Sequence, residues 1–399
     1  MEGAWDEAMI AMSRWSRLQS LWLLVLIVWG CQPTKPIPAP AGSGEGSAAP
    51  APVVAIPALP PSQERGGIGR TGAVEWQAPA ALQTIVWKVQ LESASTTIAF
   101  GTRLFAANAK SLAAIDGATG QTIWSRPVTR GMASTPVITE EAVLLSTGDR
   151  KLASLDTKTG ETRWETRLKQ TADGGLLLQG DRLFVTSSAG TAWSFDASNG
   201  KKDWSVWIAP SVQSAPALDG DLLLIGAGLK RGGAVFAMKT DSGAEWWSME
   251  TDASVTVSPA VIGQTVLAVD KAGNVYAIGR STGQLLWRSK AGSEVAGAFA
   301  VDAQLIYVAT TGGEVLALSL SDGSERWRVQ AGGSFRSPLV RAANAILAGN
   351  DDGHLRSFDP STGRELWRFQ AGATIRDEVG MATNCLSFSA GDGNLFCVR

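Results

Sequence analysis

One short phrase recurs along this 399-residue chain at an almost fixed interval. The first complete copy is Asp116-Gly-Ala-Thr-Gly120-Gln-Thr-Ile-Trp124, and the second runs from Asp156 to Trp164. Seven complete copies end in a tryptophan, and an eighth tryptophan precedes them without the turn in front: Trp87, Trp124, Trp164, Trp204, Trp247, Trp287, Trp327 and Trp367. Successive tryptophans are 37, 40, 40, 43, 40, 40 and 40 residues apart. A repeat of about forty residues that holds several short strands is typical of a β-propeller.

The glycine four residues before each of the seven later tryptophans indicates a tight hairpin turn, because glycine enters the left-handed region without a Cβ penalty. The tryptophan then begins the outermost strand of its repeat. A flat ring with one N–H suits a half-buried seam between neighbouring sheets, with its face packed and its edge hydrogen-bonded. The alternative is that these rings stack on a cofactor or a sugar. Eight copies at one equivalent position favour the structural interpretation.

Four strand-like segments fill each interval, for example 123–127, 134–138, 142–146 and 151–155. The chain begins with an outer strand around Trp87 that has no inner strands before it, and it ends with inner strands that have no tryptophan strand after them. We therefore predict an all-β fold, an eight-bladed β-propeller of four-stranded blades, closed by pairing the N-terminal strand with the C-terminal blade. Three extra residues around 226–233 lengthen one repeat. They are either a tolerated surface insertion or a partner contact.

An apolar run at 21–30 follows two arginines and ends at Cys31. Ten apolar residues are too few to span a bilayer, so residues 1–30 are predicted to be a secretory signal peptide. The segment Val28-Trp29-Gly30-Cys31 resembles a bacterial lipobox, which predicts lipidation of Cys31. Gln32 after the cysteine points to the outer membrane by the same resemblance. The alternative is a signal peptide that is cut elsewhere. The acidic residues Glu2, Asp6 and Glu7 are atypical of a signal peptide, so we expect translation to begin at Met12.

Residues 31–80 are rich in proline, alanine, glycine and serine and cannot bury a core, so they are expected to form a lipidated, flexible tether. The propeller is predicted to occupy residues 81–399. Cys385 and Cys397 fall in consecutive strands around one turn and are expected to be cross-strand neighbours. An exported protein meets an oxidising compartment, where such a pair forms a disulfide. Two buried thiols are the alternative.

Composition and motifs argue against several classes of function. The chain has 35 Lys and Arg against 37 Asp and Glu, so bulk electrostatics do not favour nucleic-acid binding. The only histidine, His354, falls in a predicted blade turn, which leaves no evident nucleophile–histidine pair. The stretch Asn350-Asp-Asp-Gly353 lacks the alternating ligands and the closing glutamate of a calcium loop. We expect no catalytic residues, no metal and no cofactor.

The repeated Asp-x-x-Thr-Gly-x-x-x-Trp phrase resembles the repeat of propellers related to pyrroloquinoline-quinone enzymes, over about residues 81–399. With eight blades, a lipobox and about 400 residues, the chain resembles the lipoprotein B subunit of the outer-membrane β-barrel assembly machinery. That resemblance implies a non-enzymatic scaffold, lipid-anchored at the periplasmic face of the outer membrane, that binds the periplasmic domains of the barrel-forming subunit. The alternatives are a quinoprotein dehydrogenase, although this chain lacks that family's adjacent cysteine pair, and a stand-alone envelope sensor or binding propeller.

Loops that join blades and loops that join second and third strands lie on one side of a propeller. On that side the sequence places five cations that we interpret as a basic rim: Arg130, Lys230, Arg231, Arg336 and Arg376. A basic rim would steer a partner with acidic loops and would raise the on-rate more than the affinity. The alternative is ordinary solvated loop charge.

Overall fold

The computed structural model describes residues 72–399, apart from 83, 92–95, 109 and 383–384. All the described residues belong to one compact unit, Pro57–Arg399. The predicted signal peptide, Cys31 and the predicted tether up to residue 71 lie outside the described residues. Within the described part, no helix is long and apolar enough to cross a membrane.

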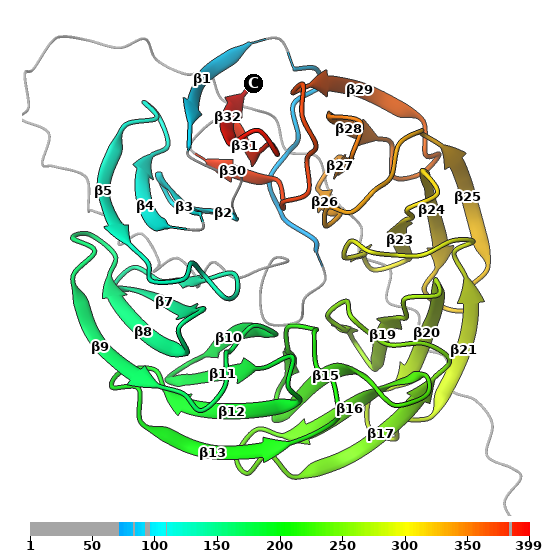
Figure 1. Ribbon diagram of the computed structural model, residues 1–399. Helices are drawn as coiled ribbons and strands as arrows, with labels where there is room; N and C mark the ends of the chain where they lie inside the picture. The colour runs from blue at the N-terminus through cyan, green and yellow to red at the C-terminus, as the bar shows by residue number, and fades with distance from the viewer. Residues whose placement is uncertain (1–71, 83, 92–95, 109, 383–384) are drawn as a thin grey trace, which may run out of the picture. The chain divides into compact units, whose positions relative to one another are not determined.

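Thirty-two strands form eight four-stranded antiparallel sheets, the blades, which follow one another in a ring (Figure 1). This confirms the predicted eight-bladed β-propeller. Blades 1 to 4 contain β2 (Thr97–Phe100), β3 (Arg103–Ala107), β4 (Ser111–Asp116), β5 (Thr122–Pro127); β6 (Val137–Ile138), β7 (Ala142–Thr147), β8 (Lys151–Asp156), β9 (Thr162–Arg167); β10 (Gly175–Gln179), β11 (Arg182–Thr186), β12 (Thr191–Asp196), β13 (Lys202–Trp207); β14 (Ala217–Asp219), β15 (Leu222–Gly228), β16 (Gly233–Lys239) and β17 (Glu245–Thr251).

Blades 5 to 7 continue the same order, and blade 8 combines the two ends of the described chain. Their strands are β18 (Ala260–Ile262), β19 (Thr265–Val269), β20 (Asn274–Gly279), β21 (Leu285–Lys290); β22 (Ala300–Val301), β23 (Leu305–Ala309), β24 (Glu314–Ser319), β25 (Glu325–Gln330); β26 (Val340–Ala342), β27 (Ala345–Gly349), β28 (His354–Phe358), β29 (Glu365–Gln370); and β30 (Gly380–Ala382), β31 (Cys385–Ser389), β32 (Asn394–Val398) with β1 (Ile85–Gln90).

Burial follows from the place of each strand within its blade. Third strands such as β4 are buried on both faces, because each blade is packed between two neighbours. Outermost strands such as β5 alternate between exposed and half-buried residues along most of their length. The apolar core is divided into eight clusters, and each cluster lies between two neighbouring blades. The ring is therefore held by eight seams rather than by one central core.

The antiparallel order of the strands gives the ring two different faces. We call the upper face the side that carries the loops between blades and the turns between second and third strands. The lower face carries the turns between first and second strands and the turns between third and fourth strands.

The ring closes in blade 8, as predicted. Strand β1 pairs antiparallel with β32, and Trp87 lies opposite Cys397 in that register. Thr84 and Arg399 exchange both backbone hydrogen bonds, each 2.9 Å long. The outer strand of the last blade is therefore supplied by the first strand of the chain.

Residues 72–82, which the sequence analysis assigned largely to the tether, lie against blade 7. Gly72 and Val74 hydrogen-bond to the backbone of Arg341 on the free edge of β26, the innermost strand, in a parallel arrangement. Asn344 then bonds Ala78 through both side-chain atoms, at 2.7 and 2.9 Å. Trp76 and Leu82 pack on the apolar cluster between blades 7 and 8. The packed part therefore includes Gly72, nine residues before the predicted start of the propeller.

Each seam tryptophan joins its own blade to the next one. The indole N–H donates to a backbone carbonyl of the neighbouring blade at 2.8 to 3.1 Å in the seven regular copies. The ring face covers the turn glycine of that blade, where an added Cβ would lie 2.4 to 3.0 Å from ring atoms. Trp367 has no such turn ahead of it, and its N–H instead donates to the carbonyl of Pro79 at 2.7 Å. The segment before β1 thus replaces the missing turn.

This arrangement predicts the effect of two truncations. A chain that begins at Thr84 loses the carbonyl that accepts from Trp367, the segment that pairs with β26, and the buried side chain of Trp76. Its free energy of unfolding should therefore fall by at least about 3 kcal/mol. A chain that begins at Gly72 keeps all these contacts and should match the full-length protein. Urea unfolding of both chains measures the difference. Equal stability of the two chains would contradict the role assigned to residues 72–82.

The seam glycines allow a second prediction, with a control inside the same fold. Gly200 and Gly180 have φ values of 71° and 54°, so an alanine at either position carries the left-handed backbone cost of about 1–2 kcal/mol. Only at Gly200 would the new Cβ meet the ring of Trp164, at 2.4 Å, whereas at Gly180 it meets nothing within 4 Å. Gly200→Ala should therefore be less stable than Gly180→Ala by about 1–3 kcal/mol in thermal or urea unfolding. Equal losses would show that the ring exerts no steric limit.

Candidate functional site

A polar cavity of about 260 Å³ lies on the upper face, where the loops leading into the innermost strands of blades 3 to 8 converge. Most of its lining is small, including Gly174, Ala215 and Gly297, and its cations are Arg336 and Arg376. Gly72 contacts Leu339 and Phe299, which directly follow lining residues along their loops. The N-terminal segment therefore lies immediately below this cavity.

Two of the five predicted rim cations share one carboxylate. The Nε atoms of Arg336 and Arg376 lie 3.2 and 2.8 Å from the two carboxylate oxygens of Asp351. Asp351 stands in the turn between β27 and β28, whereas the arginines come from the loops before and after blade 7. The three side chains form one cluster with a net charge of +1, so this part of the rim is less basic than the sequence predicted.

The other three predicted rim cations are exposed on the upper face, and no ion pair is recorded for them within the described residues. Arg130 lies in the loop between blades 1 and 2 with a φ of 59°. Lys230 and Arg231 occupy the turn between β15 and β16. The three-residue insertion extends these two strands to seven residues each, instead of lengthening the turn alone as predicted. Lys230 and Arg231 are therefore carried outward on a longer hairpin, by about 3.3 Å for each added residue pair.

Asp377 is a titratable group on this side that the sequence analysis missed. In blade 7 the hydroxyl of Ser337 bonds both backbone atoms of Gly349, at 2.8 and 2.9 Å, and so ties the inter-blade loop to the second strand. Asp377 stands forty residues later, at the equivalent position of blade 8, and Ser389 donates a hydrogen bond to its carboxylate. Burial raises the pKa of Asp377 to about 6. The sequence did contain a sign of this buried acid, because Asp377 stands where several other repeats have a serine.

His354, the remaining residue that the sequence singled out, takes part in structural contacts. His354 begins β28, and its Nδ1 lies 2.8 Å from Asp352, which also bonds Arg356. Among the described residues, no three or more His, Cys, Asp or Glu side chains are grouped so that they could hold a metal ion.

Cys385 and Cys397 are joined by a disulfide, with their Cα atoms 5.4 Å apart. The predicted disulfide is thus confirmed. In the register of β31 and β32, Cys397 lies opposite Ser387, which is two residues from Cys385. The bond therefore runs diagonally between β31 and β32. Both cysteines belong to the apolar cluster between blades 8 and 1, so the disulfide stabilises the blade that closes the ring.

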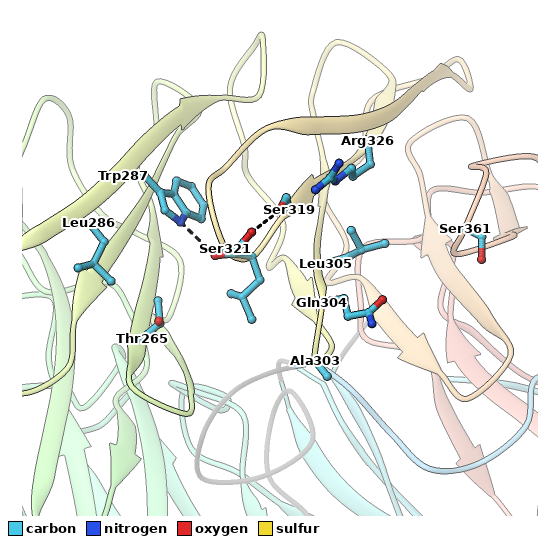
Figure 2. A pocket seen from close by; sticks show the side chains of 11 residues that line it. Thr265, Leu286, Trp287, Ala303, Gln304, Leu305, Ser319, Ser321, Arg326 and Ser361 are labelled. Carbon is cyan, nitrogen blue, oxygen red and sulfur yellow. Dashed lines mark hydrogen bonds between the residues drawn. The ribbon is translucent and has the colours of Figure 1, made fainter. Parts of the chain in front are cut away.

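A larger hollow of about 710 Å³ lies on the lower face at the outer ends of blades 5 and 6 (Figure 2). Leu286 and Trp287 of β21 form one wall, and Leu305 and Arg326 of blade 6 stand across from them. Ser319 and Ser321 share a hydrogen bond of 2.9 Å, and the indole N–H of Trp287 donates to Leu320. The lining has no carboxylate and no histidine, so it offers binding surface but no acid–base pair.

The family profile described as outer membrane protein assembly factor BamB matches residues 68–171, 108–273 and 271–398. Among solved structures, BamB from Moraxella catarrhalis is 19% identical with a TM-score of 0.68, over 79% of this chain and 99% of that chain. The quinohemoprotein alcohol dehydrogenase of Comamonas testosteroni is 14% identical with a TM-score of 0.71, over 84% and 80% of the two chains. A europium-containing methanol dehydrogenase is 14% identical with a TM-score of 0.69, over 82% and 89%. These structural likenesses show the fold alone. No match was found among curated protein sequences.

The raised pKa of Asp377 predicts how stability depends on pH. The folded pKa of about 6 lies above the ordinary value of 3.8, so this group's contribution is fully present below about pH 4 and is lost as the pH rises through 6. Asp377→Asn removes the titration. Relative to the parent, the free energy of unfolding of the variant should increase by up to about 3 kcal/mol as the pH rises from 4 to 7.5. Urea unfolding across that range, with Asp221→Asn as the control for loss of a carboxylate, checks it. If the free energies of unfolding of the parent and of Asp377→Asn change in parallel with pH, the raised pKa of Asp377 is contradicted.

Proposed function

Because the chain belongs to the outer membrane protein assembly factor BamB family, we propose that it is a non-enzymatic scaffold that assists the folding and insertion of outer-membrane β-barrel proteins. In this role it binds the periplasmic domains of the barrel-forming subunit and is held at the outer membrane by lipid on Cys31. The observation that carries the proposal is the family match, which extends from residue 68 to residue 398.

The upper face supports a binding role. A closed ring with eight packed seams fixes the positions of its loops, and loops on a rigid scaffold commonly carry function. Arg130, Lys230 and Arg231 extend from this face as exposed cations, and the hairpin that carries two of them is the longest of the eight. Cations at such positions speed the approach of an acidic partner and mainly change the on-rate and its salt dependence.

A quinoprotein dehydrogenase is the second candidate, because enzymes of that class share the fold. The residues of this chain do not fit a quinone with its metal ion. The lining of the upper cavity contains two arginines and no carboxylate, and the sequence has no adjacent cysteine pair. Protein incubated with pyrroloquinoline quinone and calcium should show no bound quinone absorbance and no alcohol oxidation. Retained quinone with turnover would establish the second candidate instead.

The scaffold proposal predicts that reversing the free cations weakens partner capture. The variant Arg130→Glu, Lys230→Glu, Arg231→Glu should fold normally, since exposed substitutions rarely cost more than about 0.5 kcal/mol each. Its association rate with the purified periplasmic domains of the barrel-forming subunit should fall about tenfold or more at low salt. Biolayer interferometry across a salt series measures this, and the difference should shrink as salt rises.

The lower face supplies a matched control with the same change in charge. Lys158, Lys201 and Arg364 are exposed cations in the turns between third and fourth strands. Their reversal to Glu should leave the association rate within about twofold of the parent, apart from the long-range effect of net charge. Equal losses for both triple variants would remove the upper-face assignment. A parent protein that does not capture these domains would contradict the proposed function itself.

A further inference from the structure

The outermost strand of blade 5 exposes more apolar side chain at its start than its neighbours β17 and β25 do. In β21, Leu285 is 51% exposed and Leu286 is 57% exposed. The strand is hydrogen-bonded only to β20 within the described residues, so its outer edge presents unpaired N–H and C=O groups. A free edge beside exposed leucines is a surface that proteins usually protect or use.

The repeat itself provides the comparison for this position. The residue before each seam tryptophan is Val86, Ile123, Arg163, Asp203, Trp246, Leu286, Arg326 or Leu366. In blade 2, Arg163 forms an ion pair with Glu141 at 3.4 Å, and the hollow beside them measures about 380 Å³. In blade 5, an uncharged leucine borders a hollow of about 710 Å³ (Figure 2). The same place in the fold thus carries an ion pair beside a smaller hollow in one seam and an uncharged side chain beside a larger hollow in another.

The hollow has the chemistry of a side-chain pocket. Leu286 and Leu305 give it apolar walls, and serine hydroxyls, Gln304 and Arg326 supply polar groups (Figure 2). An apolar side chain that entered from the edge of β21 would be covered by these walls. Specificity in strand addition commonly comes from such pockets, whereas the main-chain hydrogen bonds supply affinity.

The chain already shows that a free edge of this ring accepts an added segment. Ala73 pairs in parallel with Arg341 on the free inner edge of β26, through two hydrogen bonds of 2.8 and 2.9 Å. At the upper end of β21, Arg288 forms an ion pair with Asp252, whereas no ion pair of Lys290 is recorded within the described residues. No side chain of β21 is acidic. An incoming segment with an acidic residue near Lys290 would therefore complement the strand.

We propose that the free edge of β21, with the hollow beside Leu286, is a docking site for an extended segment of another protein. The segment carries apolar side chains at alternate positions, which place one of them in the hollow, and a carboxylate that faces Lys290. The site lies on the outer rim toward the lower face and does not depend on the upper-face contact proposed above.

The test uses the full chain and one fluorescent peptide, a nonapeptide in which valine alternates with threonine and one terminal residue is glutamate. Fluorescence anisotropy at millimolar and lower peptide concentrations gives the affinity. The variant is Leu286→Arg, which the fold accommodates because Arg163 and Arg326 occupy the same position in blades 2 and 6. It should weaken binding by at least about tenfold, the loss expected from removing one buried apolar contact. Leu366→Arg, the equivalent change in blade 7, is the matched control and should stay within about twofold.

A second probe isolates the main-chain contribution. The same peptide with alternate backbone nitrogens methylated keeps its side chains but loses its donors, and it should no longer bind. Hydrogen exchange of the outward amides of β21 should slow only with the unmethylated peptide. Absence of peptide binding, equal binding by Leu286→Arg, equal loss in Leu366→Arg, or equal binding of the methylated peptide would each overturn the proposal. Self-association abolished by Leu286→Arg would overturn it as well, since the edge would then serve a second copy of this chain.

Discussion

The structure depends on the contact between one indole ring and the turn of the next blade. The ring face covers a glycine, and the ring N–H donates to a carbonyl of the same turn. Each blade is thereby fixed against its neighbour by one large apolar surface and one directed hydrogen bond. This contact explains why glycine and tryptophan recur together and why the interval between them hardly varies. A blade that was longer or shorter in its outer half would move the ring away from its turn.

The need for an eighth contact explains what happens at the ends of the chain. Blade 8 takes its outer strand from residues 85–90, so no repeat turn is left to receive Trp367. The segment before β1 supplies Pro79 as the acceptor and reaches it across the lower face of blade 7. The disulfide between Cys385 and Cys397 adds a covalent bond within the same blade. The closure is therefore built from three different contacts, whereas the other seams repeat one.

The repeated pattern made most of the fold predictable. Strand number, blade number and closure follow from the spacing of Trp87 to Trp367, because those features are properties of a repeat. The features that the sequence analysis missed are departures from the repeat. Residues 72–82 have the composition of a tether and pack only because blade 7 offers a free inner edge and an unfilled turn position. The diagonal disulfide depends on a register that spacing does not reveal. The shared carboxylate of Asp351 and the burial of Asp377 depend on how loops from different blades converge.

The same distinction, between features of the repeat and departures from it, applies to the candidate binding surfaces. The upper-face cations could be placed on one side from topology alone, but two of the five are joined through Asp351, which only the structure reveals. The hollow beside Leu286 was not predicted, since a single leucine in one of eight similar strands carries no signal until its neighbours are known. Function in such a ring is expected where one blade departs from the others.

The central claim is that the ring is one cooperative unit, closed as firmly at Trp87 and Trp367 as at the six seams between them. Native-state hydrogen exchange of the eight seam indole N–H groups, followed by NMR, tests it directly. The account predicts that all eight protons exchange only through global unfolding, with the same opening free energy. Much faster exchange of Trp87 and Trp367 than of Trp124 to Trp327 would show that blade 8 opens on its own, and would contradict the claim.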